Sequence, residues 1–121
     1  MTLPASDDEV LLLHNPRCSK SRATAALLLE RGIAYTERRY LEDPLDASEL
    51  KELRARLDRP VREWLRRGEP AARALAPDSD EDALLAAMAR EPALMERPIV
   101  VRGLRARVGR PPTDVLALFE D

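Results

Sequence analysis

The sequence predicts an α/β fold in which helices pack on a mixed four-stranded sheet. Two features predict it: a strand, a helix and a second strand follow one another near the N-terminus, and a β-hairpin followed by a helix ends the chain. A strand–helix–strand unit makes its two strands parallel, whereas a hairpin makes them antiparallel. The expected order is therefore β-α-β, a helical insertion, and β-β-α.

The first unit occupies residues 10–40. Val10–Leu13 reads VLLL, and a continuous apolar run of this kind is typical of a strand buried on both faces. A helix is predicted over Ser19–Arg31, because alanines and leucines give it a broad apolar side and Gly32 is a natural stop. Ile33–Tyr40 is predicted to be the second strand, near an edge of the sheet because it carries adjacent arginines.

Residues 46–92 are predicted to form the helical insertion, carried by one domain that spans residues 1–121. Asp46 or Ser48 is a candidate cap for a helix that ends near Leu57. Pro60 begins a further helical turn, and short helices are expected over residues 71–75 and 81–90. Trp64 is expected to be a packing residue of this segment.

The last unit begins with a strand over Arg97–Val101. Gly103 suits a tight turn, after which Arg105–Val108 is expected to return as an antiparallel strand. A terminal helix is predicted over residues 114–120, where apolar side chains dominate.

Length and charge exclude several classes of protein. The chain has 121 residues and a net charge of −2, and this length suits one domain with its own core. A general nucleic-acid binder usually carries a basic excess, so no nucleic acid is expected as a partner. No apolar run approaches the roughly 20 residues of a membrane helix, and the acidic N-terminus does not resemble a secretory signal. We therefore expect a cytoplasmic protein with no membrane partner.

Cys18 is the only cysteine and the main candidate for chemistry. A lone cysteine is often just a small buried hydrophobe. Cys18, however, lies between a buried strand and the start of a helix, where free backbone N–H groups and the helix dipole favour a negative charge. Arg17, Lys20 and Arg22 add cations within four residues, and such a setting lowers the pKa of a thiol. We therefore expect a nucleophilic thiolate.

The residues around Cys18 supply further candidates. Ser21 and Arg22 are expected to contribute to binding a substrate anion, because a hydroxyl donor and a cation suit it. Asn15 is a further substrate-binding candidate through its place in the HNPRC loop. His14, the only histidine, either helps to activate the cysteine or hydrogen-bonds at the strand end, and its spacing leaves both roles open. A metal site is not expected, since no second histidine or cysteine completes one.

Spacing excludes two other uses of the cysteine. A phosphatase-type loop needs an arginine six positions after the cysteine, where this chain has Thr24. A Cys-x-x-Cys pair needs a cysteine at the position of Ser21. An external thiol must therefore resolve any oxidised or modified Cys18.

Several motifs together resemble a known family. They are HNPRC at residues 14–18 with Ser21-Arg22 after it, YLEDP at 40–44, RPIVV at 97–101 and GRP at 109–111. In their joint spacing, from about Val10 to Phe119, the chain is similar to the glutaredoxin-dependent arsenate reductases of the ArsC/Spx family. The resemblance implies a thioredoxin-like fold.

The resemblance also implies roles for residues. Cys18 would attack arsenate and form an adduct that glutathione, as co-substrate, and glutaredoxin resolve to arsenite, with no bound cofactor and a place in arsenical resistance. Arg97 and Arg110 match the family's oxyanion-binding arginines by motif. The third such arginine matches Arg66, although Arg67 follows directly. Pro98 matches the proline that is cis and faces the cysteine in this fold.

Two rival functions remain within the same family. Spx-like members bind RNA polymerase and regulate transcription, but they typically carry a Cys-x-x-Cys switch that this chain lacks. A thiol-dependent reductase or transferase acting on another glutathione-linked substrate would also use Cys18 as its nucleophile. Its arginines would bind a different anion.

Overall fold

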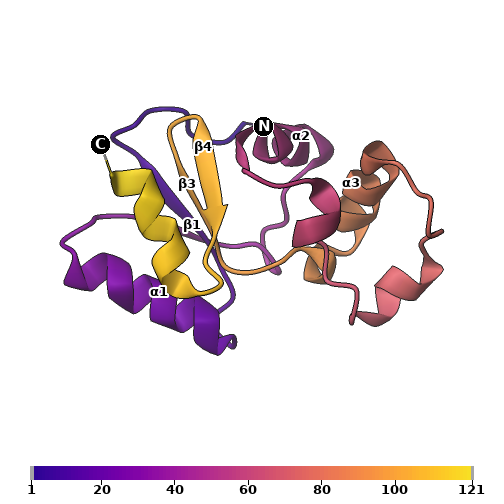
Figure 1. The fold of residues 1–121 in the computed structure, drawn as a ribbon, viewed down its shortest axis with the longest axis horizontal. Helices are drawn as coiled ribbons and strands as arrows, with labels where there is room; N and C mark the ends of the chain where they lie inside the picture. The colour runs from indigo at the N-terminus through magenta and orange to yellow at the C-terminus, as the bar shows by residue number, and fades with distance from the viewer. Residues whose placement is uncertain (1, 121) are drawn as a thin grey trace.

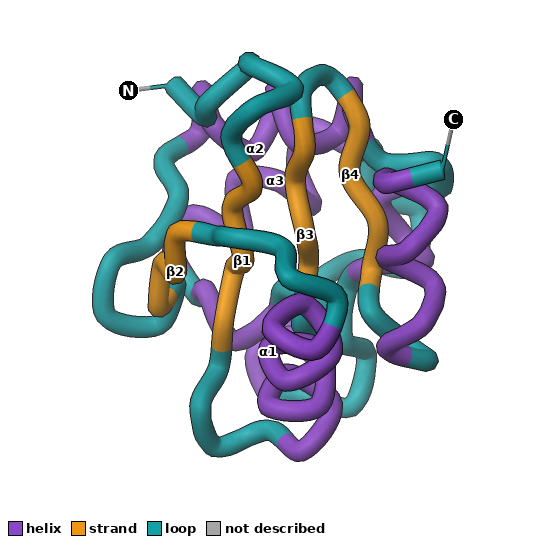
Figure 2. Tube along the Cα trace, turned by 90° about the vertical axis from the view of Figure 1, so that its left-hand side faces the viewer, coloured by secondary structure: helices purple, strands orange, loops and turns teal. Residues whose placement is uncertain are grey.

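A four-stranded mixed sheet organises the computed structural model, which describes residues 2–120. Its strands are β1 (Val10–His14), β2 (Thr36–Arg39), β3 (Ile99–Arg102) and β4 (Arg105–Val108), in the spatial order β2-β1-β3-β4 (Figure 2). β1 pairs in parallel with β2 and antiparallel with β3, and β3 pairs antiparallel with β4. The predicted mixed sheet of one parallel unit and one hairpin is confirmed.

Helices lie on both sides of this sheet (Figure 1). On one side are α1 (Ser19–Glu30) and the terminal 3-10 helix η4 (Pro112–Phe119), and on the other are α2 (Ala47–Arg56) and α3 (Glu81–Arg90). Because side chains alternate along a strand, β1 serves both layers. Leu12 packs with the α1 and η4 cluster, whereas its neighbours Leu11 and Leu13 pack with the larger cluster of the helical segment.

The helical segment, residues 47–94, ends beside the stretch of chain that leads into β3. Besides α2 and α3 it holds the short 3-10 helices η1 (Val61–Trp64), η2 (Pro70–Ala74) and η3 (Pro92–Leu94). Trp64 is fully buried, as expected of a packing residue. The backbone N–H of Arg66 donates to Leu94 O at 2.7 Å, and that of Glu96 donates to Trp64 O at 2.9 Å. These bonds bring Arg66 beside the segment that leads into β3.

Several element boundaries differ from the sequence prediction; β3, for example, begins at Ile99 rather than at Arg97. β2 begins at Thr36 rather than at Ile33, because the N–H of Ile33 donates to Leu28 O at 2.9 Å and still belongs to the end of α1. The intervening Gly32 has a φ of 70°, which glycine adopts readily. The terminal helix starts earlier than predicted and is a 3-10 helix, with a proline in its first turn.

Gly109 packs the end of β4 against the start of β3. Its N–H donates to Pro98 O at 2.9 Å. A Cβ at this position would lie 2.7 Å from Thr24 Oγ1 and 2.8 Å from Pro98 Cγ, so a side chain would push on α1 or on Pro98. Glycine therefore allows three segments to meet closely next to the loop that carries Cys18.

A buried ion pair joins β2 to α2. The carboxylate of Glu49, 1% exposed, accepts hydrogen bonds from Arg38 Nη1 at 2.6 Å and Nη2 at 3.1 Å. Of the two expected caps, Asp46 is the one used: it accepts from Glu49 N at 2.8 Å, and its own N–H donates to Glu49 Oε1 at 3.1 Å. Mainly through the bond from Arg38, which outweighs burial, the pKa of Glu49 is lowered.

We predict that Glu49→Gln lowers the free energy of unfolding by about 3 kcal/mol at neutral pH, because it leaves Arg38 without its buried partner. A carboxyl whose pKa is lowered in the folded protein contributes stability that is fully present above its unfolded-state pKa of about 4.3. This contribution is lost as the pH falls through the folded-state pKa. The difference from wild type should therefore shrink in acid. Urea unfolding at several pH values measures it, with Glu30→Gln on the exposed end of α1 as control. Equal losses in the two variants would contradict the assignment.

Candidate active site around Cys18

Cys18 occupies the N-cap position of α1, the residue whose side chain faces the free N–H groups of the first turn. Its backbone is extended, with φ −94° and ψ 127°. The loop before it is held by local bonds: Cys18 N donates to Asn15 O at 3.0 Å, and Arg17 N donates to Asn15 Oδ1 at 3.0 Å. Asn15 thus shapes the loop, as short polar side chains do in turns.

The surroundings favour the thiolate form of Cys18. Burial raises the pKa of the half-buried thiol. The backbone N–H groups of Ser21 and Lys20 lower it, the charges of Arg97 and Arg110 lower it further, and the net pKa is below the ordinary value. The first turn of α1 contains no acidic residue to oppose them. The Cys18 side chain makes no cap hydrogen bond of normal geometry, but a thiolate at this position faces the N–H groups that an Asp or Ser side chain bonds at other helix starts.

Ser21 fixes the strand end to the helix. It is fully buried, and its Oγ lies 2.7 Å from His14 Nδ1 and accepts from Asn15 N at 3.0 Å. Its backbone N–H acts on Cys18, while its hydroxyl acts on the loop. The structure therefore places the Ser21 hydroxyl as a support for the loop.

His14 is the last residue of β1 and is only 5% exposed. Burial lowers the pKa of His14, and the charges of Arg39 and Arg22 lower it further. The charge of Glu37, whose Oε1 lies 3.9 Å from His14 Nε2, acts in the opposite direction, but the net pKa is lowered. The ring is therefore neutral at physiological pH. Of the two roles left open by the sequence, the structure displays the hydrogen bond at the strand end, and no interaction among residues 2–120 joins the ring to Cys18.

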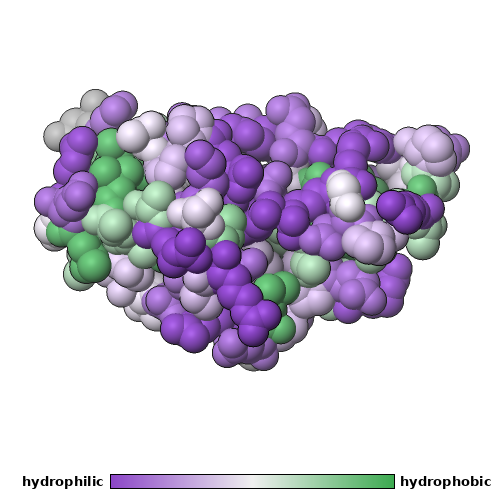
Figure 3. Space-filling model, turned by 90° about the horizontal axis from the view of Figure 1, so that it is seen from below, coloured by the Kyte–Doolittle hydropathy of each residue, from purple (hydrophilic) through white to green (hydrophobic). Residues whose placement is uncertain are grey.

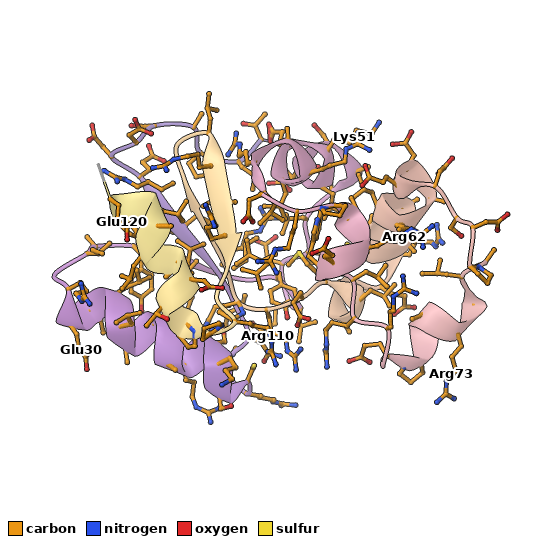
Figure 4. All side chains as sticks on the ribbon, in the orientation of Figure 1. Glu30, Lys51, Arg62, Arg73, Arg110 and Glu120 are labelled. Atoms are coloured by element: carbon orange, nitrogen blue, oxygen red, sulfur yellow. The ribbon has the colours of Figure 1, made fainter. Side chains whose placement is uncertain are left out.

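Arg97 and Arg110 approach the site from the two sides of the β-hairpin. Arg110 Nη1 donates to Arg97 O at 3.2 Å. Both arginines precede a cis peptide bond, Arg97–Pro98 and Arg110–Pro111; the first was expected and the second was not. In Figure 4, Arg110 lies between α1 and the helical segment. Since both charges lower the pKa of Cys18, the two guanidinium groups act on the sulfur from outside its own loop.

Glu96 compensates these charges, a role that the sequence did not suggest. Its Oε1 lies 2.9 Å from Arg97 Nη1 and 3.9 Å from Arg110 Nε. A glutamate next to an arginine in sequence is common on protein surfaces. Glu96 differs from such a pair because Arg110, from the other end of the hairpin, also lies near its carboxylate. Glu96 therefore occupies a position between two guanidinium groups that an oxyanion would also favour.

Arg66 and Arg67 point to different surroundings. Arg66 Nη1 lies 2.6 Å from Glu69 Oε1 and 3.3 Å from Ala93 O, and its charge acts on Tyr40, as does that of Arg97. Arg67 is exposed and lines a separate pocket of about 190 Å³ in the helical segment. The geometry thus favours Arg66 as the arginine on the Cys18 side.

Arg22 closes the outer side of the loop. It is exposed, and its Nη1 donates to Pro16 O at 3.0 Å. The expected site residues thus fall into two groups: Asn15, Ser21, Arg22 and His14 shape or support the loop, whereas Arg97 and Arg110 bring positive charge to the Cys18 sulfur. The charge of Arg66 acts on Tyr40, the residue on which Arg97 and Cys18 also act.

The surface around the site is polar. Seen from below, the middle of the molecule is largely hydrophilic (Figure 3). Within the described part of the chain, no group of three or more His, Cys, Asp or Glu side chains is placed to hold a metal ion. None of the helices in residues 2–120 has the length and apolar character needed to cross a membrane. The thiolate-stabilising start of α1 and the charges of Arg97 and Arg110, not these absences, suit the site to thiolate chemistry on an anion.

Comparisons with known proteins agree with this arrangement. The family model described as the ArsC family matches residues 13–118. An arsenate reductase of Neisseria meningitidis is 46% identical over 115 residues, covering 92% of this chain and 98% of that protein. An arsenate reductase of Haemophilus influenzae is 37% identical over 114 residues, covering 91% and 98%.

A solved structure gives the same result for the fold. The arsenate reductase from Vibrio cholerae superposes with a TM-score of 0.86 and 44% sequence identity, covering 95% of this chain and 99% of that one. The predicted thioredoxin-like fold class is confirmed.

We predict that Glu96→Gln moves the pH midpoint of Cys18 alkylation to a lower value, because it leaves the charges of Arg97 and Arg110 uncompensated while keeping a similar shape. Arg97→Gln should move the midpoint to a higher value. The pH dependence of iodoacetamide modification, followed by mass spectrometry, measures both. Arg90→Gln, at an exposed position of α3, is the control. Midpoints that do not separate Glu96→Gln from Arg97→Gln would show that these charges do not act on the sulfur.

Proposed function

Because the chain belongs to the ArsC family, we propose that it reduces arsenate to arsenite with Cys18 as the nucleophile. The observation that carries the proposal is the thiolate-stabilising start of α1 under the charges of Arg97 and Arg110. The names of the relatives agree with it. A doubly charged oxyanion repels a thiolate, so guanidinium groups are needed to bring the two together.

The reaction begins when the oxyanion replaces Glu96 between the arginines. In the proposal Arg97, Arg110 and Arg66 hold the oxygens while the Cys18 sulfur attacks arsenic. An As–S bond forms and an As–O bond breaks, and the departing oxygen is protonated and leaves as water. The guanidinium groups stabilise the charge that moves onto oxygen during this displacement.

External thiols supply the two electrons. Glutathione attacks arsenic, so that a second As–S bond forms and a second oxygen leaves as water. A glutaredoxin thiol then attacks the glutathione sulfur: an S–S bond forms, the As–S bond to glutathione breaks and its electron pair stays on arsenic. Two thiols are thereby oxidised to a mixed disulfide while As(V) becomes As(III). Hydrolysis of the remaining As–S bond frees arsenite and returns Cys18. The dependence on an external thiol is supported by the sequence, in which Cys18 is the only cysteine.

A hollow beside the catalytic loop supports entry of glutathione. It measures about 240 Å³, adjoins His14 and Asn15, and has Arg17 and Arg39 on its wall. Arg17 suits a carboxylate of glutathione, and Arg39, which pairs with Glu37 at 2.6 Å, adds positive charge to the same wall. A cytoplasmic location belongs to the same proposal, because a free low-pKa thiol served by glutathione requires a reducing compartment.

We predict arsenate-dependent NADPH oxidation when glutathione, glutathione reductase and glutaredoxin are supplied. Cys18→Ser should lower the rate by about a thousandfold or more, because the hydroxyl is far less nucleophilic than a thiolate. Omission of glutathione should also abolish the rate.

An inactive wild type whose Cys18 is nonetheless rapidly alkylated near neutral pH would overturn arsenate as substrate. It would favour the rival reading, a family member that acts on another glutathione-linked anion. Activity that persists in Cys18→Ser would exclude both readings.

A further inference from the structure

The hydroxyl group of Tyr40 is buried without a hydrogen-bond partner. Tyr40 directly follows β2 and is 1% exposed, and its ring lies in the core with Leu45, Leu50 and Met95. Its Oη meets no partner of normal geometry among the residues that the structure describes. Buried hydroxyl groups are nearly always satisfied, because leaving one unpaired costs as much as losing a hydrogen bond. The hydroxyl is therefore a candidate donor to a ligand, provided that its surroundings suit one.

The groups that act on this hydroxyl are those of the active site. Burial raises the pKa of Tyr40 to about 12, Arg97 and Arg66 partly oppose this, and the negative charge of Cys18 adds to it. The side chain of Asn15 also interacts with the hydroxyl, though not with the geometry of a full hydrogen bond. Tyr40 thus stays protonated at physiological pH and is available as a neutral donor.

A second unpaired donor lies in the same set of residues. Arg97 Nε is buried and has no partner within residues 2–120, although Nη1 of the same side chain pairs with Glu96. Two unpaired donors therefore belong to two residues that act on each other and on Cys18. A molecule with several acceptor oxygens would satisfy both, which the single carboxylate of Glu96 does not.

We propose that the Tyr40 hydroxyl donates a hydrogen bond to the tetrahedral oxyanion held at Cys18, together with Arg97 Nε. The inference rests on the proposed function and assigns Tyr40 as a substrate-binding residue. Unlike a further cation, a neutral donor strengthens binding of the anion without altering the charge on Cys18. Its removal should therefore weaken binding of the oxyanion and leave the thiol unchanged.

The variant that tests this is Tyr40→Phe, which keeps the buried ring and removes only the hydroxyl. Tyr35→Phe is a matched control, because Tyr35 is the other tyrosine and packs with the cluster under α1 and η4. Arsenate and phosphate, without glutathione, are tested for protection of Cys18 against iodoacetamide. The anion concentration for half-protection should rise about tenfold or more in Tyr40→Phe, the effect of one hydrogen bond to a charged group. It should not change in Tyr35→Phe.

The outcomes separate this inference from the proposed function. Protection of wild type and Tyr40→Phe at the same anion concentration would overturn the role of Tyr40 and leave the oxyanion site intact. No protection of the wild type by either anion would overturn the proposed function and the tyrosine with it. Weaker protection accompanied by a changed alkylation rate in the absence of anion would show a structural effect on Cys18, which also contradicts the proposal.

Discussion

The negative charge on a half-buried sulfur is the constraint on which the rest of this structure depends. Burial alone would keep Cys18 protonated, so the fold must supply donors and positive charge. The donors are the backbone N–H groups at the start of α1. They are in place because the buried Ser21 hydroxyl bonds the end of β1 and the backbone of Asn15, which fixes the turn that precedes the helix.

Positive charge brings a second requirement, since guanidinium groups gathered in one place repel one another. Glu96 and Glu69 relieve this repulsion while no anion is bound. Backbone bonds from the helical segment to the entry of β3, and from Gly109 to Pro98, hold the contributing segments in register. The site is thus assembled from the start of one helix and from segments distant in sequence, and Glu96 lies against both arginines that are proposed to hold the oxyanion.

Most helices and strands and the reactive cysteine could be predicted from local sequence. The features that could not be predicted depend on contacts between distant parts of the chain. The apolar VLLL run, the glycine stops and the Cys18 context are local signals, and the elements they predicted are present. The early start predicted for the second strand was wrong, because the N–H of Ile33 is hydrogen-bonded to Leu28 at the end of α1. Glu96 gave no signal, since an acid next to an arginine is ordinary. Tyr40 was recognised only as the first residue of the YLEDP motif, which does not say what its hydroxyl does. Their significance depends on Arg110, Arg66 and Cys18, which only the folded chain brings near them.

The most direct test of this account is the ionisation of Cys18 in the wild-type protein. The ultraviolet absorbance of the thiolate, titrated against pH with Cys18→Ser as the blank, reports it without any assumption about substrate. The account predicts a midpoint below the value of about 8.5 found for an ordinary cysteine. A midpoint at or above that value would mean that burial outweighs the helix start and the arginines, and would contradict the central claim.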